Sequence, residues 1–110
     1  MQKVLYISIP MAGKDEKKQR ATAKMYQRVY EADGFKVINP YDLGDELEKD
    51  HLFKEIDPPT YEEYMVKDLV ALDNCTHILF CDGWANSKGC VREADRALEL
   101  KLTVMPRLAK

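Results

Sequence analysis

Short apolar runs and longer amphipathic segments alternate along this chain. The apolar runs, each four to six residues long, cover residues 4–9, 35–39, 77–81 and 102–105. Such runs are typical of strands buried on both faces of a sheet. Between them, apolar side chains recur at helical spacing over residues 14–32, 60–74 and 88–100. The pattern predicts strands and helices in alternation.

Local signals mark where two of the helices begin and where the first one ends. Gly34 follows the first amphipathic segment and suits the left-handed position after a last helical turn. Thr60 and Glu63 have the spacing of a capping box, and Ser87 is a good N-cap for the last helix.

The alternation predicts one α/β domain over residues 1–110, of the Rossmann or flavodoxin-like kind. Helices would cover both faces of a parallel sheet of four or five strands, in the order 2-1-3-4. In such sheets a ligand binds outside the carboxyl ends of the strands, where the strand order reverses. The loops at residues 9–14 and 82–89 are therefore expected to form the site.

Residues 41–59 interrupt the alternation, since Pro40 is expected to close the second strand and an irregular excursion to follow. The excursion holds seven acidic residues against two lysines. A short helix within it is plausible, and the exposed apolar residues Leu52, Phe53 and Ile56 suit an interface. A lid or interface element and a solvated surface excursion remain equally open.

The composition excludes several functional classes. The formal net charge of -2 offers no basic field for nucleic acid. Three cysteines, an odd number without a C-x-x-C pair, indicate neither a disulfide framework nor a zinc site. No apolar run is long enough to span a membrane, and no signal peptide is recognised, so a cytoplasmic location is expected.

Asp68 is the most informative single position. On the predicted helix over residues 60–74 it falls in the middle of an apolar stripe, between Tyr64 and Leu72. A carboxylate in that place must be paired, hydrogen-bonded or protonated, and it becomes a candidate acid or base with a raised pKa. The alternative is that Asp68 only accepts hydrogen bonds from a neighbouring loop.

Glu93 is the second candidate, on the last helix. The buried face of that helix is predicted to hold Cys90, Val91, Ala94, Ala97 and Leu98, with Glu93 at its edge. A structural role near the helix N-terminus is the alternative reading. Two carboxylates that point into one cleft from neighbouring helices nevertheless form the arrangement used for chemistry at the C1′ carbon of a sugar.

Two small turns could hold an anion. Ser87 and Gly89 begin the last helix, where free amide groups favour negative charge, and residues 10–14 form a glycine-containing turn with a lysine. Neither matches a known phosphate-loop pattern, so helix capping without a ligand is the alternative. Trp84 could stack on a base or cover the edge of the core, and the Tyr6 hydroxyl could reach the site from mid-strand.

Three segments together resemble one known family. Residues 6–13 (YISIPMAG), 61–69 (YEEYMVKDL) and 82–94 (DGWANSKGCVREA) resemble motifs of the nucleoside 2-deoxyribosyltransferase-like superfamily. Within it, the chain is most similar to small proteins of the DUF4406 type, which are related to 2′-deoxynucleoside 5′-phosphate N-hydrolases. The resemblance covers nearly the whole chain outside the acidic excursion.

The resemblance implies an N-glycosidase or deoxyribosyltransferase that acts on a 2′-deoxynucleoside or its 5′-monophosphate and needs no metal or organic cofactor. Glu93 would attack C1′, and Tyr6 would position Glu93 or the sugar. Asp68 would protonate or orient the departing base, or activate the acceptor. The substrate contacts expected from the motifs are Ser8, Pro10, Met11, Ala12, Gly13, Trp84, Ser87, Gly89 and Arg92. A homodimer or larger homo-oligomer is expected, because relatives assemble in that way.

Two departures from the family pattern bear on the reaction. Val91 and Arg92 stand where the hydrolases have Gly-Tyr, and Arg92 is expected to pair with Glu93 or to bind phosphate. The chain also ends soon after the last strand, which favours hydrolysis or binding over base exchange. A catalytically silent nucleotide-binding module therefore stays the alternative to an enzyme. An interaction domain of receiver-like topology is a third reading.

Overall fold

A computed structural model describes residues 2–107 and has the predicted α/β architecture. The strands β1 (Val4–Ser8), β2 (Lys36–Ile38), β3 (His77–Phe80) and β4 (Thr103–Met105) form one parallel sheet. Their order is β2-β1-β3-β4, as predicted from the alternation of strands and helices. The order reverses between β1 and β3, and the carboxyl ends of these two strands therefore flank the expected ligand crevice.

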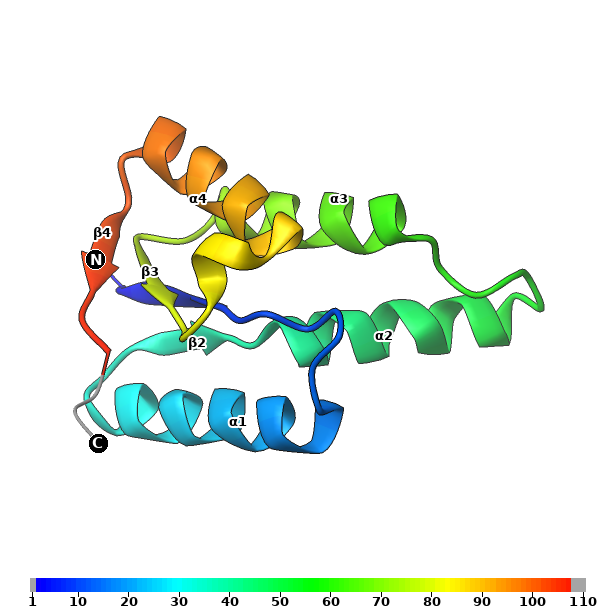
Figure 1. Ribbon diagram of the computed structural model, residues 1–110, viewed down its shortest axis with the longest axis horizontal. Coiled ribbons are helices and arrows are strands. Elements are labelled where there is room, and N and C mark those ends of the chain that lie inside the picture. The colour runs from blue at the N-terminus through cyan, green and yellow to red at the C-terminus, as the bar shows by residue number, and fades with distance from the viewer. Residues whose placement is uncertain (1, 108–110) are drawn as a thin grey trace.

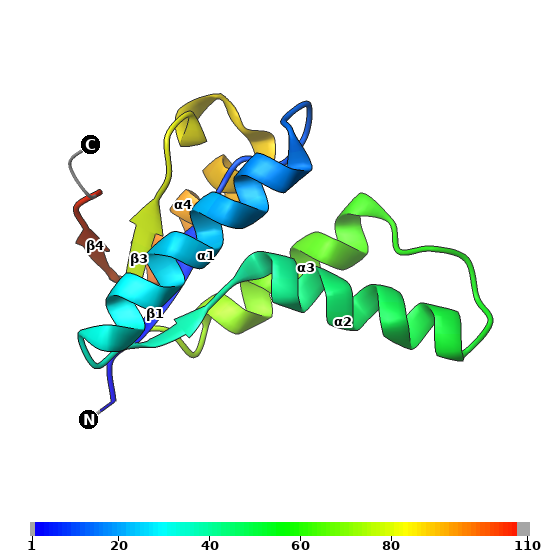
Figure 2. The ribbon, with the colours of Figure 1, turned by 90° about the horizontal axis from the view of Figure 1, so that it is seen from below.

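Helices cover both faces of this sheet (Figure 1). Helix α1 (Glu16–Ala32) lies on one face, whereas α3 (Tyr61–Leu72) and α4 (Lys88–Leu100) lie on the other, as the view from below also shows (Figure 2). Successive side chains of β1 point to opposite faces of the sheet. Leu5 and Ile7 belong to the core packed beneath α1, and Tyr6 belongs to the core on the α3–α4 side.

The segment expected to be irregular, with a short helix as a plausible part, begins with a full helix of 14 residues, α2 (Pro40–Phe53). Asn39 is its N-cap, with a side chain that accepts a hydrogen bond from the Tyr41 amide at 3.0 Å. Pro40 does not simply close the strand, because it occupies the first turn, where a missing N–H costs nothing. A short 3-10 helix, η1 (Trp84–Asn86), was also not predicted.

The predicted helix starts at Thr60 and Ser87 are confirmed. Thr60 and Glu63 form both hydrogen bonds of a capping box, at 3.2 and 3.0 Å. The Ser87 hydroxyl accepts a hydrogen bond from the Cys90 amide at 3.3 Å. Gly34 has a φ of 91°, which explains why a glycine follows the first helix.

The predicted buried face of α4 needs a correction. Val91 and Leu98 are exposed, and the buried residues of the helix are Cys90, Glu93 and Ala97. Glu93 thus lies at the centre of the buried face instead of its edge. The sheet tolerates a carboxylate there because β1 supplies hydroxyl groups that hydrogen-bond to it.

No helix within residues 2–107 combines the length and the apolar character needed to cross a lipid bilayer.

Candidate functional site

A cleft of about 800 Å³ opens beside the carboxyl ends of β1 and β3. Its walls include the loop after β1, from Ile9 to Ala12 with Lys14, and the stretch from Asn86 to Cys90 at the start of α4. These are the two loops that the topology predicts. The volume lies in the range of pockets that hold small organic ligands.

The floor of the cleft is the carboxylate of Glu93, which is only 5% exposed. The Tyr6 hydroxyl donates a hydrogen bond to Oε2 at 2.6 Å, and the Ser8 hydroxyl donates one to Oε1 at 2.7 Å. Tyr6 and Ser8 are two apart on β1, so they point to the same side of the sheet, toward α4. Both carboxylate oxygens of Glu93 are therefore held in place.

Asp68 faces Glu93 from α3 and also lines the cleft. Burial raises the pKa of Asp68, and the nearby charge of Glu93 raises it further. Burial likewise raises the pKa of Glu93, while the hydrogen bonds from Tyr6 and Ser8 act in the opposite direction. Burial beside these two acids also raises the pKa of Tyr6.

The hydroxyl donors distinguish the two acids. Hydrogen bonds to a charged carboxylate favour its ionised form, and Glu93 receives two from hydroxyl groups of a strand. Two carboxylates this close do not readily carry two negative charges in a buried place. The arrangement favours one shared proton, with Asp68 as its carrier and Glu93 as the anion.

A positive end of the cleft lies at the start of α4. The first amides of a helix have no intrahelical acceptor, and here Lys88 and Gly89 occupy those positions. The Ser87 hydroxyl caps the helix, and Lys14 lines the same cleft. Gly89 has a packing role as well, because an added Cβ would lie 3.4 Å from the Met65 sulfur on α3.

The predicted site residues divide into three groups. Pro10, Met11, Ala12, Ser87 and Gly89 line the cleft together with Asp68 and Glu93. Tyr6 and Ser8 lie buried beneath it and reach it through Glu93.

Gly13, Trp84 and Arg92 do not line the cleft. Gly13 has a φ of 73° in the turn that leads to α1, which a glycine adopts without strain. Trp84 packs on Phe80, with ring centroids 4.6 Å apart. Arg92 pairs with Glu62 at 2.6 Å instead of with Glu93, so it bridges the outer sides of α4 and α3.

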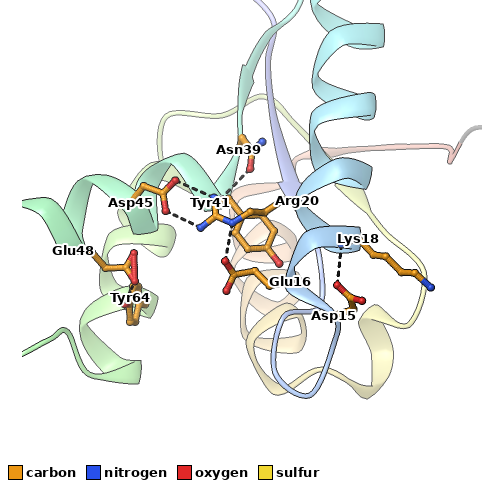
Figure 3. Close-up of polar contacts among 9 residues, drawn as sticks. All are labelled: Asp15, Glu16, Lys18, Arg20, Asn39, Tyr41, Asp45, Glu48 and Tyr64. Atoms are coloured by element: carbon orange, nitrogen blue, oxygen red, sulfur yellow. Dashed lines mark hydrogen bonds and ion pairs between the residues drawn. The ribbon is translucent and has the colours of Figure 1, made fainter.

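One wall of the cleft was missed because α2 was predicted as an irregular segment. Arg20 of α1 makes a two-pronged hydrogen bond to Asp45 of α2, at 2.9 and 2.8 Å, and lies over the Tyr41 ring (Figure 3). Next to it, the Tyr64 hydroxyl donates to Glu48 at 3.0 Å. The dipeptide Asn39-Pro40, an N-cap followed by a first-turn proline, is the signal that could have revealed this helix.

The described residues, 2–107, contain no cluster of three histidine, cysteine or acidic side chains placed to hold a metal ion. The cleft instead offers two coupled acids, hydroxyl groups and amide donors. This set of groups can move a proton, and it can attack an electrophilic carbon.

Fold and site thus define a parallel α/β protein with a two-carboxylate cleft at the reversal of strand order. The chain belongs to the family described as "Domain of unknown function (DUF4406)", whose model matches residues 3–106. Neither a search of curated proteins nor one of solved structures finds a match.

Proposed function

We propose that the protein cleaves the N-glycosidic bond of 2′-deoxynucleosides or their 5′-monophosphates through a glutamate nucleophile. The single observation that carries this proposal is the buried Glu93 carboxylate, which is held on both oxygens and faces Asp68 in an open cleft. Paired carboxylates of this kind catalyse substitution at the C1′ carbon of sugars. The resemblance of three segments to the nucleoside 2-deoxyribosyltransferase-like superfamily supports the same substrate class.

In the first step, a Glu93 oxygen attacks C1′ and the bond from C1′ to the base nitrogen breaks. The departing base takes the electron pair of that bond and the proton of Asp68. The products are the neutral free base, a deoxyribosyl ester of Glu93 and an ionised Asp68. The raised pKa of Asp68 suits it to hold this proton near neutral pH.

In the second step, Asp68 removes a proton from water, whose oxygen attacks C1′ and displaces Glu93. The products are the free deoxyribose, or its 5′-phosphate, and the two acids in their initial states. If a second base replaces water, the same step becomes base exchange. Tyr6 and Ser8 position Glu93 and stabilise its charge when it departs from the sugar.

The positive end of the cleft supports a nucleoside 5′-phosphate. Gly89 and Glu93 are four residues apart on α4, so they are about one helical turn, 5.4 Å, from each other on one side of the helix. A sugar placed with C1′ at Glu93 directs its 5′ substituent toward the first amides of α4 and toward Lys88 and Lys14.

The test is a panel of 2′-deoxynucleosides and their 5′-monophosphates, with free base quantified by chromatography. We expect base release from the wild-type protein and none above background from Glu93→Gln, which keeps the shape but not the nucleophile. Glu99→Gln changes an exposed acid of the same helix and is the matched control. Activity that survives in Glu93→Gln would overturn the assignment of the nucleophile.

A catalytically silent nucleotide-binding module gives a different result. In that case nucleotides raise the thermal stability of the protein, yet no base is released on long incubation. That outcome would replace the proposed reaction with a binding function at the same cleft.

A further inference from the structure

The cleft has a second wall that the proposed chemistry does not use. It consists of Arg20 from α1, Asp45 and Glu48 from α2, and Tyr64 from α3, and all four line the cleft (Figure 3). In the proposed reaction the glycosidic bond is broken between Glu93 and Asp68. This second wall is therefore available to the part of the ligand that extends away from the sugar.

Helix α3 gives the direction in which that part extends. Tyr64 lies four residues before Asp68, so the two side chains leave the same side of the helix about 5.4 Å apart. We infer that a base that takes its proton from Asp68 extends along α3, with its far edge toward Tyr64, because both side chains line the cleft. The Tyr64 hydroxyl donates to Glu48, so this far edge meets the Glu48 carboxylate.

Hydrogen bonds link the partly or fully exposed side chains of this wall to one another. Arg20 is engaged by Glu16 at 3.0 Å and by both oxygens of Asp45. Glu48 accepts from Tyr64 through Oε1, and no other hydrogen bond or ion pair of Glu48 occurs within residues 2–107. The second oxygen of Glu48 can thus accept a hydrogen bond from a ligand.

We propose that Glu48, oriented by Tyr64, selects bases that carry an exocyclic amino group. This inference rests on the proposed function, because that function places a base in the cleft. An ionised carboxylate only accepts hydrogen bonds, so an amino group on the base satisfies it. A carbonyl oxygen at the same ring position cannot donate, so it offers the second oxygen of Glu48 no hydrogen bond.

Two pairs of nucleotides carry this difference, together with a change of the neighbouring ring nitrogen from an acceptor to an N–H donor. 2′-Deoxycytidine and 2′-deoxyuridine 5′-monophosphates differ in the amino or carbonyl group at C4 of the ring. 2′-Deoxyadenosine and 2′-deoxyinosine 5′-monophosphates differ in the same way at C6. We expect the amino member to bind about 10-fold more tightly in at least one pair, the lower end of the range for a hydrogen bond to a charged group, because Glu48 is exposed to solvent.

Binding is measured by calorimetry in the Glu93→Gln background, which removes the proposed nucleophile and so prevents turnover. Adding Glu48→Gln, whose amide both donates and accepts, is expected to bring the ratio within each pair to about threefold or less. Glu46→Gln is the matched control, because Glu46 is an exposed acid of the same helix that pairs with Lys67 outside the cleft. It is expected to keep the ratio.

The inference is overturned if the amino member has no advantage in either pair, if Glu48→Gln leaves the ratio unchanged, or if none of the four nucleotides binds. Failure of the proposed function is a separate result. A wild-type protein that discriminates within the pairs but releases no base would keep the selective role of Glu48 and lose the glycosidase reaction.

Discussion

Replacing Asp68 by asparagine changes how the stability of the protein depends on pH. In the unfolded chain an aspartate loses its proton near pH 4. In the fold, burial and the charge of Glu93 raise the pKa of Asp68 to about 8. Between these two values the Asp68 carboxyl holds about one proton more in the folded protein than in the unfolded chain. This group therefore stabilises the fold most at low pH, and its contribution disappears as the pH rises toward 8.

The size of the effect follows from proton linkage. One extra proton in the folded state lowers the free energy of unfolding by about 1.4 kcal/mol for each pH unit gained. From pH 5.5 to pH 7.5 the Asp68 carboxyl is therefore expected to cost the wild-type protein roughly 2–3 kcal/mol relative to Asp68→Asn, whose amide does not ionise. The burial that raises the pKa of Glu93 acts in both proteins. For a domain of this size, that difference shifts the unfolding temperature by roughly 10 °C.

The assay is urea or thermal unfolding of both proteins at pH 5.5, 6.5 and 7.5. Comparing the two proteins cancels the contributions of groups that titrate alike in both, such as His77, to the pH dependence of stability. Glu62→Gln is the control, because it removes an exposed acid of the same helix whose pKa is lowered by Arg92, and its curve should run parallel to the wild type. A parallel curve for Asp68→Asn would refute the shared proton between Asp68 and Glu93.

Three further predictions concern single side chains. Tyr6→Phe removes a hydrogen bond to a charged group, worth about 1.5–3 kcal/mol, so the pKa of Glu93 should rise. The acid limb of the kcat/KM profile for base release should then move up by about 1–2 pH units. A limb that does not move would contradict the positioning role of Tyr6. Asn39→Ala should cost about 1–2 kcal/mol in urea unfolding because α2 loses its N-cap, whereas Asn39→Asp, which can still cap the helix, should lose less; equal losses would count against capping. Arg92→Ala should leave kcat/KM for base release within about twofold, since Arg92 lies outside the cleft on Glu62, and a larger loss would place it in the site.

The strand order and the location of the cleft were predictable because they follow from alternation along the chain and from the handedness of crossovers. The capping box at Thr60 is equally local, and it appears in the structure as the spacing predicts. Asp68 was recognised because a carboxylate within an apolar stripe stands out against its neighbours. These are features that short stretches of sequence encode.

What the sequence did not reveal depends on contacts between distant segments. Glu93 was placed at the edge of a helix face because a helical pattern cannot show that two hydroxyl groups of β1 would hydrogen-bond to it. Ser8 was for the same reason expected to contact substrate, although it lies buried beneath Glu93.

Helix α2 was missed for a different reason. A lid or interface element and a solvated excursion were left equally open, with only a short helix as plausible. Several acidic residues of α2 are in fact held by partners on other helices, such as Asp45 by Arg20 and Glu46 by Lys67. Gly44 also weakens the helical signal, yet there it brings α2 close to the Tyr64 ring, 3.6 Å from where a Cβ would lie.

The central claim is that Glu93 forms a covalent bond to the sugar, and its most direct test is to trap that bond. A 2′-deoxy-2′-fluoroarabino nucleoside 5′-phosphate suits the purpose, because fluorine at C2′ slows the formation and the hydrolysis of the glycosyl ester. Mass spectrometry of the incubated protein should show the added mass of the fluorinated sugar phosphate on the peptide that contains Glu93, and no adduct in Glu93→Gln. Base release from natural nucleotides without such an adduct, or an adduct on another residue, would contradict the account.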